Sequence, residues 1–304
     1  MSLLAESPHT NDANAVHIDL ENDPHIQKAH TVNSRGEKGC PSYFKGGVFF
    51  KPLSTLVRFE KEVSFYQKLS RKPRNALFPE FYGVCRSKGH GEGAVGQAPR
   101  QFMMLENVEA KFRHPCTMDL KLGTQLYDED ATKEEKEKKD SKCPMQKVTG
   151  YSVIGMKVFD TTTNTYRTFG KRDRALLNEN TVVEQGLLSF FFDGKNFRFD
   201  LVRPIKEKLE AVFDWFKTES TYRFYGHSVL VVYEGDAVRV GGRKGVPREE
   251  ELVQVHLIDF AHWYQNKDGQ KDEGSLKGLR SIIAGLERIE AFAGTACALY
   301  DIHT

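Results

Sequence analysis

The sequence is poor in the residues that build disulfide frameworks and structural zinc sites. Its 304 residues include five cysteines, an odd number, and no CxxC pair occurs. The cysteines are widely scattered, at positions Cys40, Cys85, Cys116, Cys143 and Cys297. This pattern argues against a disulfide-stapled domain and against a zinc site. It favours a reducing compartment, so we expect a nuclear or cytoplasmic location.

Long apolar runs and an excess of one charge are also lacking. No stretch approaches the roughly 20 apolar residues of a membrane span, and the first residues lack a signal-peptide pattern, so we expect a soluble chain. The 44 Lys and Arg residues are nearly matched by 42 Asp and Glu residues. The resulting net charge of +2 gives no field that would attract nucleic acid, and any anion site must be local.

The order of predicted elements favours an α+β fold with two lobes. Residues 1–24 are polar and acidic, and we expect a disordered tail there. Strand patterns dominate residues 25–107, the predicted N-lobe, although residues 57–69 have helical spacing. Residues 108–304 mix strands and helices and form the predicted C-lobe. A ligand cleft is expected between the lobes.

A lysine and a glutamate in the predicted N-lobe suit nucleotide binding. Lys51 lies at the end of the apolar strand GVFFKPL, from where its ammonium group can reach phosphates. Glu62 lies on the helix that follows and can pair with it. Both residues have an ordinary alternative, because a lysine at a strand end and a helix carboxylate are commonly solvated.

Three charged residues in apolar strands of the predicted C-lobe suit catalysis. Asp119 and Lys121 are two apart in the stretch PCTMDLKLG, so an extended backbone places them on the same side. The alternative is a buried ion pair that only fixes the lobe junction. Asp259 ends the apolar run VQVHLI and is well placed to hold Mg²⁺ on ATP, unless it is simply a cap or turn residue.

Four motifs in a fixed order resemble the inositol polyphosphate kinase family. PCTMDLKLG matches the family's PxxxDxKxG signature, and IDFAH at residues 258–262 matches a second element. FYGHSVLVVYEGD is similar to the FYxSSLLxVYEG strand, and RFEKEVSFY is similar to the RGExExxFY helix. The resemblance covers the chain from about Lys45 onwards. LGTQLYDEDATKEEKEK is most similar to the inositol polyphosphate multikinases, particularly the fungal type.

This resemblance implies an ATP site. Lys51 is similar to the family's phosphate-contacting lysine, and Ser228 to a serine near the phosphates. Backbone groups of Glu106 and Val108 would hold adenine at a hinge between the lobes. Asp259 resembles the Mg²⁺ ligand, so the expected cofactors are ATP and Mg²⁺.

The resemblance also implies a catalytic pair and a substrate site. Asp119 would contact the ribose or the accepting hydroxyl, and Lys121 would steady the phosphoryl group. The helix at about 130–143 is similar to the inositol phosphate-binding helix, and a solvated surface helix is the alternative. The residues expected to contact the substrate are Lys121, Lys138, Lys139, Lys142, Lys157 and His262, with Lys171 as a weaker candidate.

Departures from the family pattern refine the assignment. The chain has no GxGxxG before Lys51 and no HRD loop, which disfavours a protein kinase. His227 replaces the first serine of SSLL, and Phe59 replaces the glycine of RGE, which affects the roles of Ser228 and Glu62. Ser152 stands where some inositol trisphosphate 3-kinases have an arginine, which favours a multikinase.

The resemblance therefore implies a kinase that transfers the γ-phosphate of ATP directly to a hydroxyl of an inositol tris- or tetrakisphosphate. An inositol hexakisphosphate kinase, which makes pyrophosphates, shares these motifs and is the first alternative. A non-catalytic scaffold that senses inositol phosphates is the second. We expect a monomer with no membrane span, no nucleic-acid partner and no identified protein partner.

Overall fold

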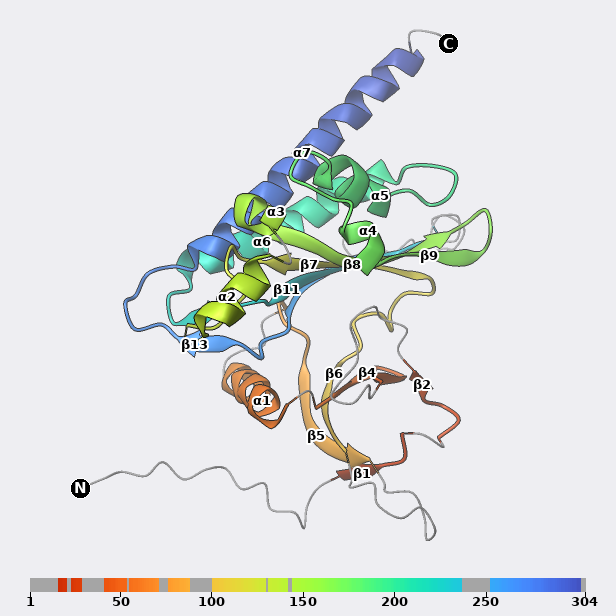
Figure 1. Cartoon of the computed structure of the whole chain (residues 1–304). Coiled ribbons are helices and arrows are strands. Elements are labelled where there is room, and N and C mark those ends of the chain that lie inside the picture. Colours follow the sequence, from red (N-terminus) through yellow and green to blue (C-terminus); the bar gives the residue numbers. More distant parts are fainter. Residues whose placement is uncertain are drawn as a thin grey trace, which may run out of the picture. The chain divides into compact units, whose positions relative to one another are not determined.

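The chain divides into two compact units. Figure 1 shows the computed structural model, which describes residues 16–20, 23–28, 41–53, 55–70, 76–87, 100–129, 131–141, 144–236 and 252–301. Unit 1 comprises residues 1–59 and 80–107, and unit 2 comprises residues 60–79 and 108–304. The chain first enters unit 2 at residue 60 and returns to it at residue 108, the residue at which the sequence predicts the C-lobe to begin. Within the described ranges, no helix is both long and apolar enough to cross a bilayer.

Unit 1 is built on one sheet. Its described strands are β1 (Val16–Ile18), β2 (Gln27–Lys28), β3 (Tyr43–Lys45), β4 (Val48–Pro52), β5 (Phe81–Ser87) and β6 (Gln101–Glu106). They follow the order β1-β5-β6-β4-β3-β2. Gly46, whose φ is +54°, supplies the left-handed turn between β3 and β4. The predicted strands around Lys51 and on both sides of residues 88–99 are therefore present.

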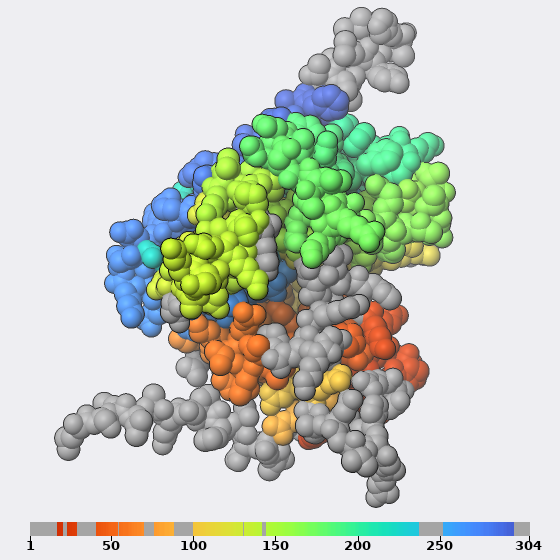
Figure 2. All heavy atoms as spheres, in the orientation of Figure 1, coloured from red at the N-terminus to blue at the C-terminus, as the bar shows by residue number. Residues whose placement is uncertain are grey.

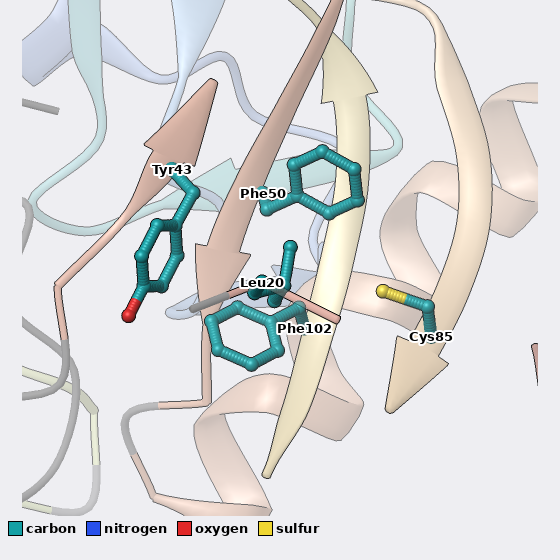
Figure 3. Packing of buried hydrophobic residues seen from close by; sticks show 5 residues of the cluster. All are labelled: Leu20, Tyr43, Phe50, Cys85 and Phe102. Carbon is teal, nitrogen blue, oxygen red and sulfur yellow. The ribbon is translucent and has the colours of Figure 1, made fainter. Parts of the chain in front are cut away.

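The first strand corrects part of the predicted disordered tail of residues 1–24: residues 16–18 form a strand, whereas residues 1–15 lie outside the described residues. β1 pairs in parallel with β5, with Val16 opposite Cys85. Leu20 is 2% exposed and belongs to a core cluster with four other side chains. Figure 3 shows the cluster, which consists of Leu20, Tyr43, Phe50, Cys85 and Phe102. A three-residue strand is too short to show a period in the sequence, yet the edge of β5 can pair with it.

Helix α1 (Leu56–Ser70) corrects the extent of the predicted N-lobe. From residue 60 onwards it belongs to unit 2. Phe65 is completely buried, and its ring centroid lies 4.3 Å from that of Phe260. The indole of Trp263 donates to the carbonyl of Lys61 at 2.8 Å. Aromatic packing therefore assigns this helix to the larger unit, although it follows β4 in the chain.

Unit 2 is built on a second sheet, whose described strands are antiparallel. They are β7 (Pro115–Leu122), β8 (Tyr151–Asp160), β9 (Thr165–Phe169), β11 (Ser228–Glu234) and β12 (Val253–Ile258), in the order β12-β11-β7-β8-β9. A separate pair joins β10 (Tyr222–Phe224) to β13 (Trp263–Gln265). The long helices α6 (Val202–Thr218) and α7 (Glu273–Asp301) lie along one face of the sheet (Figure 1).

Shorter helices surround this frame. They are α2 (Lys133–Asp140), α3 (Pro144–Thr149), α4 (Lys171–Arg174), the π-helical η3 (Val182–Leu187), α5 (Leu188–Phe190) and the 3₁₀ turn η4 (Phe199–Leu201). Thr132 and Glu135 form the capping box that the sequence predicts at the start of α2. Figure 2 shows α2, in yellow-green, at the surface of unit 2.

Two glycines set the distance between α7 and the sheet. Gly150, with φ of +77°, precedes β8, and Gly278 lies on α7. A Cβ added to Gly150 would lie 2.5 Å from the nitrogen of Gly278. A Cβ added to Gly278 would lie 2.2 Å from the carbonyl oxygen of Gly150. The two backbones therefore touch, and neither position has room for a side chain.

Candidate active site

Strand β7 presents the predicted catalytic pair on one face. Asp119 and Lys121 are half-buried, whereas Leu120 and Leu122 between and beyond them are completely buried. Leu122 packs against Gly278 of α7, so the leucines face the helices. Because side chains alternate along a strand, Asp119 and Lys121 face the other way. Their predicted position on a common face is therefore present in the structure.

Lys121 lies in a row of residues that crosses four strands. It pairs with Ser228 on β11 and with Ser152 on β8, and Ser228 pairs with Ile258 at the end of β12. Directly opposite residues on antiparallel strands have Cβ atoms about 4.5–5.5 Å apart. The Oγ atoms of Ser152 and Ser228 are buried and have no hydrogen-bond partner among the described residues. Hydroxyls thus flank the lysine on both sides.

The ammonium group of Lys121 is fixed by a turn. Its Nζ donates to the carbonyl oxygen of Gly226 at 2.7 Å. Gly226 has φ of +67°, a conformation that glycine adopts without steric cost. This turn precedes β11, so the lysine is held near the start of the strand that carries Ser228. An ammonium group has two further N–H donors for other partners.

His227 shows that several charges surround the end of β7. The ring is fully buried, and its Nε2 lies 3.3 Å from Oγ of Ser275. Burial lowers the pKa of His227 to about 4, and the charge of Lys121 contributes to this lowering against the opposing charges of Asp272 and Asp259. The charges of Lys121 and Asp259 therefore act on the same ring, in opposite directions. The imidazole is neutral at physiological pH and adds no charge to the site.

Asp259 adopts a strained backbone conformation. Its φ is +67°, in the left-handed region that residues other than glycine seldom occupy. The next N–H, that of Phe260, donates to Oε1 of Glu62 at 3.1 Å. Glu62 is 5% exposed and so is not an ordinary surface carboxylate. Such strain persists where neighbouring contacts enforce it, and it is concentrated at functional sites. Pairing of Glu62 with Lys51 stays a prediction.

His262 belongs to a group of contacts around the segment that follows β7. Its Nδ1 lies 2.9 Å from a carboxylate oxygen of Asp128. The hydroxyl of Tyr225 donates to Oε1 of Glu129 at 3.0 Å. Burial and this carboxylate raise the pKa of Tyr225 to about 12. The predicted substrate-side histidine is therefore tied to the chain that leads from β7 to α2.

The predicted substrate lysines on α2 differ in their surroundings. Lys138 is exposed on the helix. Lys139 is half-buried, and its Nζ donates to the carbonyl of Leu126 at 2.9 Å. Lys142 lies outside the described residues. Of the predicted lysines that the structure describes on this helix, Lys138 is therefore exposed, whereas Lys139 also ties α2 to the preceding segment.

Lys157 and Lys171 occupy different positions. Lys157 pairs with Thr117 on β7 and so shares the face of Asp119, but its Nζ forms a salt bridge of 2.8 Å with Glu109. The sequence does not indicate this partner. Lys171 is exposed at the first residue of α4. The structure therefore brings Lys157 to the face of the catalytic pair and shows that it is neutralised there.

The remaining predicted nucleotide residues lie near the ends of unit 1 strands. Lys51 is half-buried on β4, opposite Met103 of β6. The N–H of Glu106 donates to the carbonyl of Glu80 at 2.7 Å. Val108, the first residue of unit 2 after β6, is 6% exposed. The roles given to these residues stay predictions.

Sequence reasoning missed the residues that support the site through long-range contacts. Gln146 on α3 is 1% exposed, and its amide faces backbone carbonyls at the end of β7. Glu109 and Asp128 contact predicted substrate residues. A lone glutamine or acid has no local pattern that marks it, so only the tertiary structure reveals these contacts.

Comparisons with known proteins define the class. The model of the family described as inositol polyphosphate kinase matches residues 102–287, which is more than half of the chain. The fold is similar to that of the inositol phosphate multikinase Ipk2 from S. cerevisiae in complex with ADP and Mn²⁺, with a TM-score of 0.66 and 22% identity. That likeness covers 80% of this chain and 99% of the other. The predicted α+β fold is therefore confirmed.

The chain belongs to the inositol polyphosphate kinase family. It is 32% identical over 205 residues to inositol hexakisphosphate kinase 3 of Mus musculus, a match that covers 62% of this chain and 51% of the mouse protein. It is 28% identical over 293 residues to inositol polyphosphate multikinase beta of Arabidopsis thaliana, which covers 88% and 92% of the two chains. The chain thus spans about half the length of the mammalian relatives that it matches.

Proposed function

We propose that this protein is an ATP-dependent inositol polyphosphate multikinase. The observation that carries the proposal is the row formed by Lys121, Ser152 and Ser228, beside which Asp259 and its strained backbone lie. These residues fall within the part of the chain that the family model matches. The similarity to the Arabidopsis multikinase extends over nearly the whole of both chains, which supports the multikinase reading.

The proposed chemistry is direct in-line transfer. An inositol hydroxyl oxygen forms a bond to the γ-phosphorus, the bond from that phosphorus to the β,γ-bridging oxygen breaks, and ADP leaves with the bond electrons. Asp119 contacts the ribose or the attacking hydroxyl, whose proton is lost. Lys121 places its ammonium group at the transferred phosphoryl group, where negative charge must be neutralised. Lys51 and Ser228 contact the nucleotide phosphates, and backbone groups of Glu106 and Val108 hold adenine.

Asp259 is the proposed ligand of Mg²⁺. Among the residues that the structure describes, no three His, Cys, Asp or Glu side chains gather into a metal site. A single carboxylate nevertheless fits, because Mg²⁺ in kinases is bound by one or two carboxylates together with substrate phosphates. When bound, the ion would neutralise charge on the phosphates. The contact between Glu62 and the N–H of Phe260 fixes the backbone from which this carboxylate projects.

The substrate site is proposed around α2. Lys138 is an exposed candidate there, and the other candidates are Lys139, Lys142, Lys157 and His262. A ring that bears three or more phosphates requires such a cluster of cations. Because Lys157 is already paired with Glu109, we expect it to matter less than Lys138. A monomeric state and a nuclear or cytoplasmic location remain predictions.

A substrate panel tests the proposal. Purified protein would be incubated with radiolabelled ATP, Mg²⁺ and inositol tris-, tetrakis-, pentakis- or hexakisphosphate, and the products separated by charge. We expect transfer to tris- and tetrakisphosphates. Exclusive use of the hexakisphosphate would instead identify an inositol hexakisphosphate kinase. The similarity to the mouse hexakisphosphate kinase favours this alternative. Binding of inositol phosphates without any transfer would identify a scaffold.

A further inference from the structure

Gln146 is a buried polar residue that the proposed chemistry does not use. It lies on α3 and is 1% exposed. Its Nε2 donates to the carbonyl of Gly123 at 2.9 Å and lies 3.4 and 3.5 Å from the carbonyls of Leu122 and Lys121. These are three consecutive carbonyl groups, and the first of them belongs to the catalytic lysine. The amide therefore contacts the backbone of the segment that carries Lys121.

A polar side chain such as glutamine is unfavourable at this buried position unless its amide has a specific role. Its Oε1 is buried and has no hydrogen-bond partner among the described residues. A buried acceptor without a partner costs about 1–3 kcal/mol. An apolar side chain of similar length would fill the space without this cost. The donor function of the amide, directed at β7, is what an apolar residue could not replace.

Helix α3 is itself anchored on several sides. Lys147 forms a salt bridge of 2.7 Å with Asp140 at the end of α2. The Nζ of Lys277 on α7 donates to the carbonyl of Lys147 at 3.2 Å. The N–H of Gly123 donates to the carbonyl of Gly150, immediately after α3, at 2.9 Å. Gln146 therefore lies on an element that is joined to α2, to α7 and to the end of β7.

We propose that Gln146 is a positioning residue, which fixes the end of β7 and thereby holds Lys121 in register with the substrate helix α2. The inference rests on the proposed function, because it assigns Gln146 a role through the catalytic lysine. Because Gln146 is 1% exposed, its amide would act through the backbone of β7 and not by contact with a ligand. It keeps the lysine backbone from shifting, and small displacements of a catalytic group cost large factors in rate.

The test compares Gln146→Met with Val148→Ala. Methionine retains the length of glutamine and removes the donor, whereas Val148 is exposed on the same short helix. For Gln146→Met we expect kcat for an inositol trisphosphate to fall by about tenfold or more. We expect the KM for ATP to stay within twofold, since Lys51, Ser228 and Asp259, the residues proposed to bind the nucleotide phosphates and Mg²⁺, are unchanged. Val148→Ala should match the wild type.

A second comparison, made in a Lys121→Arg protein, distinguishes a positioning role of Gln146 from a general loss of structure. In a Lys121→Arg protein, which keeps a positive charge but not the geometry, Gln146→Met should have a much smaller effect on kcat than in the wild type. Equal effects in both backgrounds would overturn the proposal. So would a Gln146→Met protein whose kcat lies within twofold of the wild type, or one in which the KM for ATP rises as much as kcat falls.

Hydrogen exchange distinguishes failure of this inference from failure of the proposed function. A wild-type protein that transfers phosphate to none of the inositol phosphates would refute the proposed function. The amides of Leu122 and Gly123, which donate to His227 and Gly150, can still be followed without any substrate. Faster exchange there in Gln146→Met would support fixation of β7, and unchanged exchange would overturn it.

Discussion

Strand β7 has an apolar face, which is buried, and a polar face, which carries the predicted catalytic pair. Met118, Leu120 and Leu122 face α7 and the other helices, and each is at most 1% exposed. Asp119 and Lys121 alternate with them on the other face, where both neighbours of the lysine are buried serines with unsatisfied hydroxyls. The apolar face maximises burial, which stabilises the fold. The polar face retains groups that weaken the fold, which is expected where binding or catalysis requires them.

The largest expected effect comes from the polar face. Lys121→Met removes the positive charge proposed to neutralise the transferred phosphoryl group, so kcat should fall by about 10²–10³-fold. The folded structure should persist, because the side chain is half-buried and loses only its bond to Gly226. Steady-state kinetics and thermal unfolding of the same sample would check both parts. Near-normal turnover would remove the role given to Lys121.

The matched control is the neighbouring residue on the apolar face. Leu120→Ala should lower the free energy of unfolding by about 2–5 kcal/mol, since a completely buried leucine leaves a cavity. The molecules that remain folded should keep most of their activity. If Leu120→Ala lost activity without losing stability, the contrast between the two faces would be wrong.

A smaller effect is expected from His227, which lies beside the site. Its pKa is lowered to about 4 in the folded protein from its ordinary value of 6.5, mainly by burial, so the unfolded chain binds the proton more tightly. Stability from the neutral ring is therefore complete above pH 6.5 and is lost as the pH falls towards 4. The free energy of unfolding should decrease by up to about 1.4 kcal/mol per pH unit in this window.

His227→Gln provides the comparison for this pH dependence. Glutamine does not titrate, so the slope of stability against pH between 4 and 6.5 should be shallower in the variant, whatever its absolute stability. Urea unfolding at several pH values would measure the slope in both proteins. Identical slopes would show that the ring is not protonated on unfolding.

The smallest effect concerns the orphan hydroxyl beside Lys121. Ser228→Ala removes a buried group that has no partner among the described residues, so the free energy of unfolding should rise by about 1 kcal/mol. The kcat/KM for ATP should fall, because the hydroxyl is proposed to contact the phosphates. Ser152→Ala, at an equally buried position on β8, the strand on the other side of β7, serves as the comparison for stability. A loss of stability in Ser228→Ala would indicate that the hydroxyl already has a partner.

Much of unit 2 could be predicted from local sequence. The strands around Asp119 and Asp259 and the capping box of α2 have short-range signals, and the structure contains them. The long-range features have none. Glu62 and Phe260 are joined across 198 positions, and only the aromatic packing of α1 shows why the helix belongs to unit 2. Strand β1, which begins at Val16, forms only because it can pair with the edge of β5, which is distant in sequence.

The contact between Gly150 and Gly278 restricts how α7 can move relative to the sheet. No side chain separates the two backbone segments at this contact. Sliding or rotating α7 against the sheet would therefore cause a steric clash between them. The strand pair β7–β8 and the first half of α7 must then move as one piece. Lys121 on β7 belongs to this rigid part.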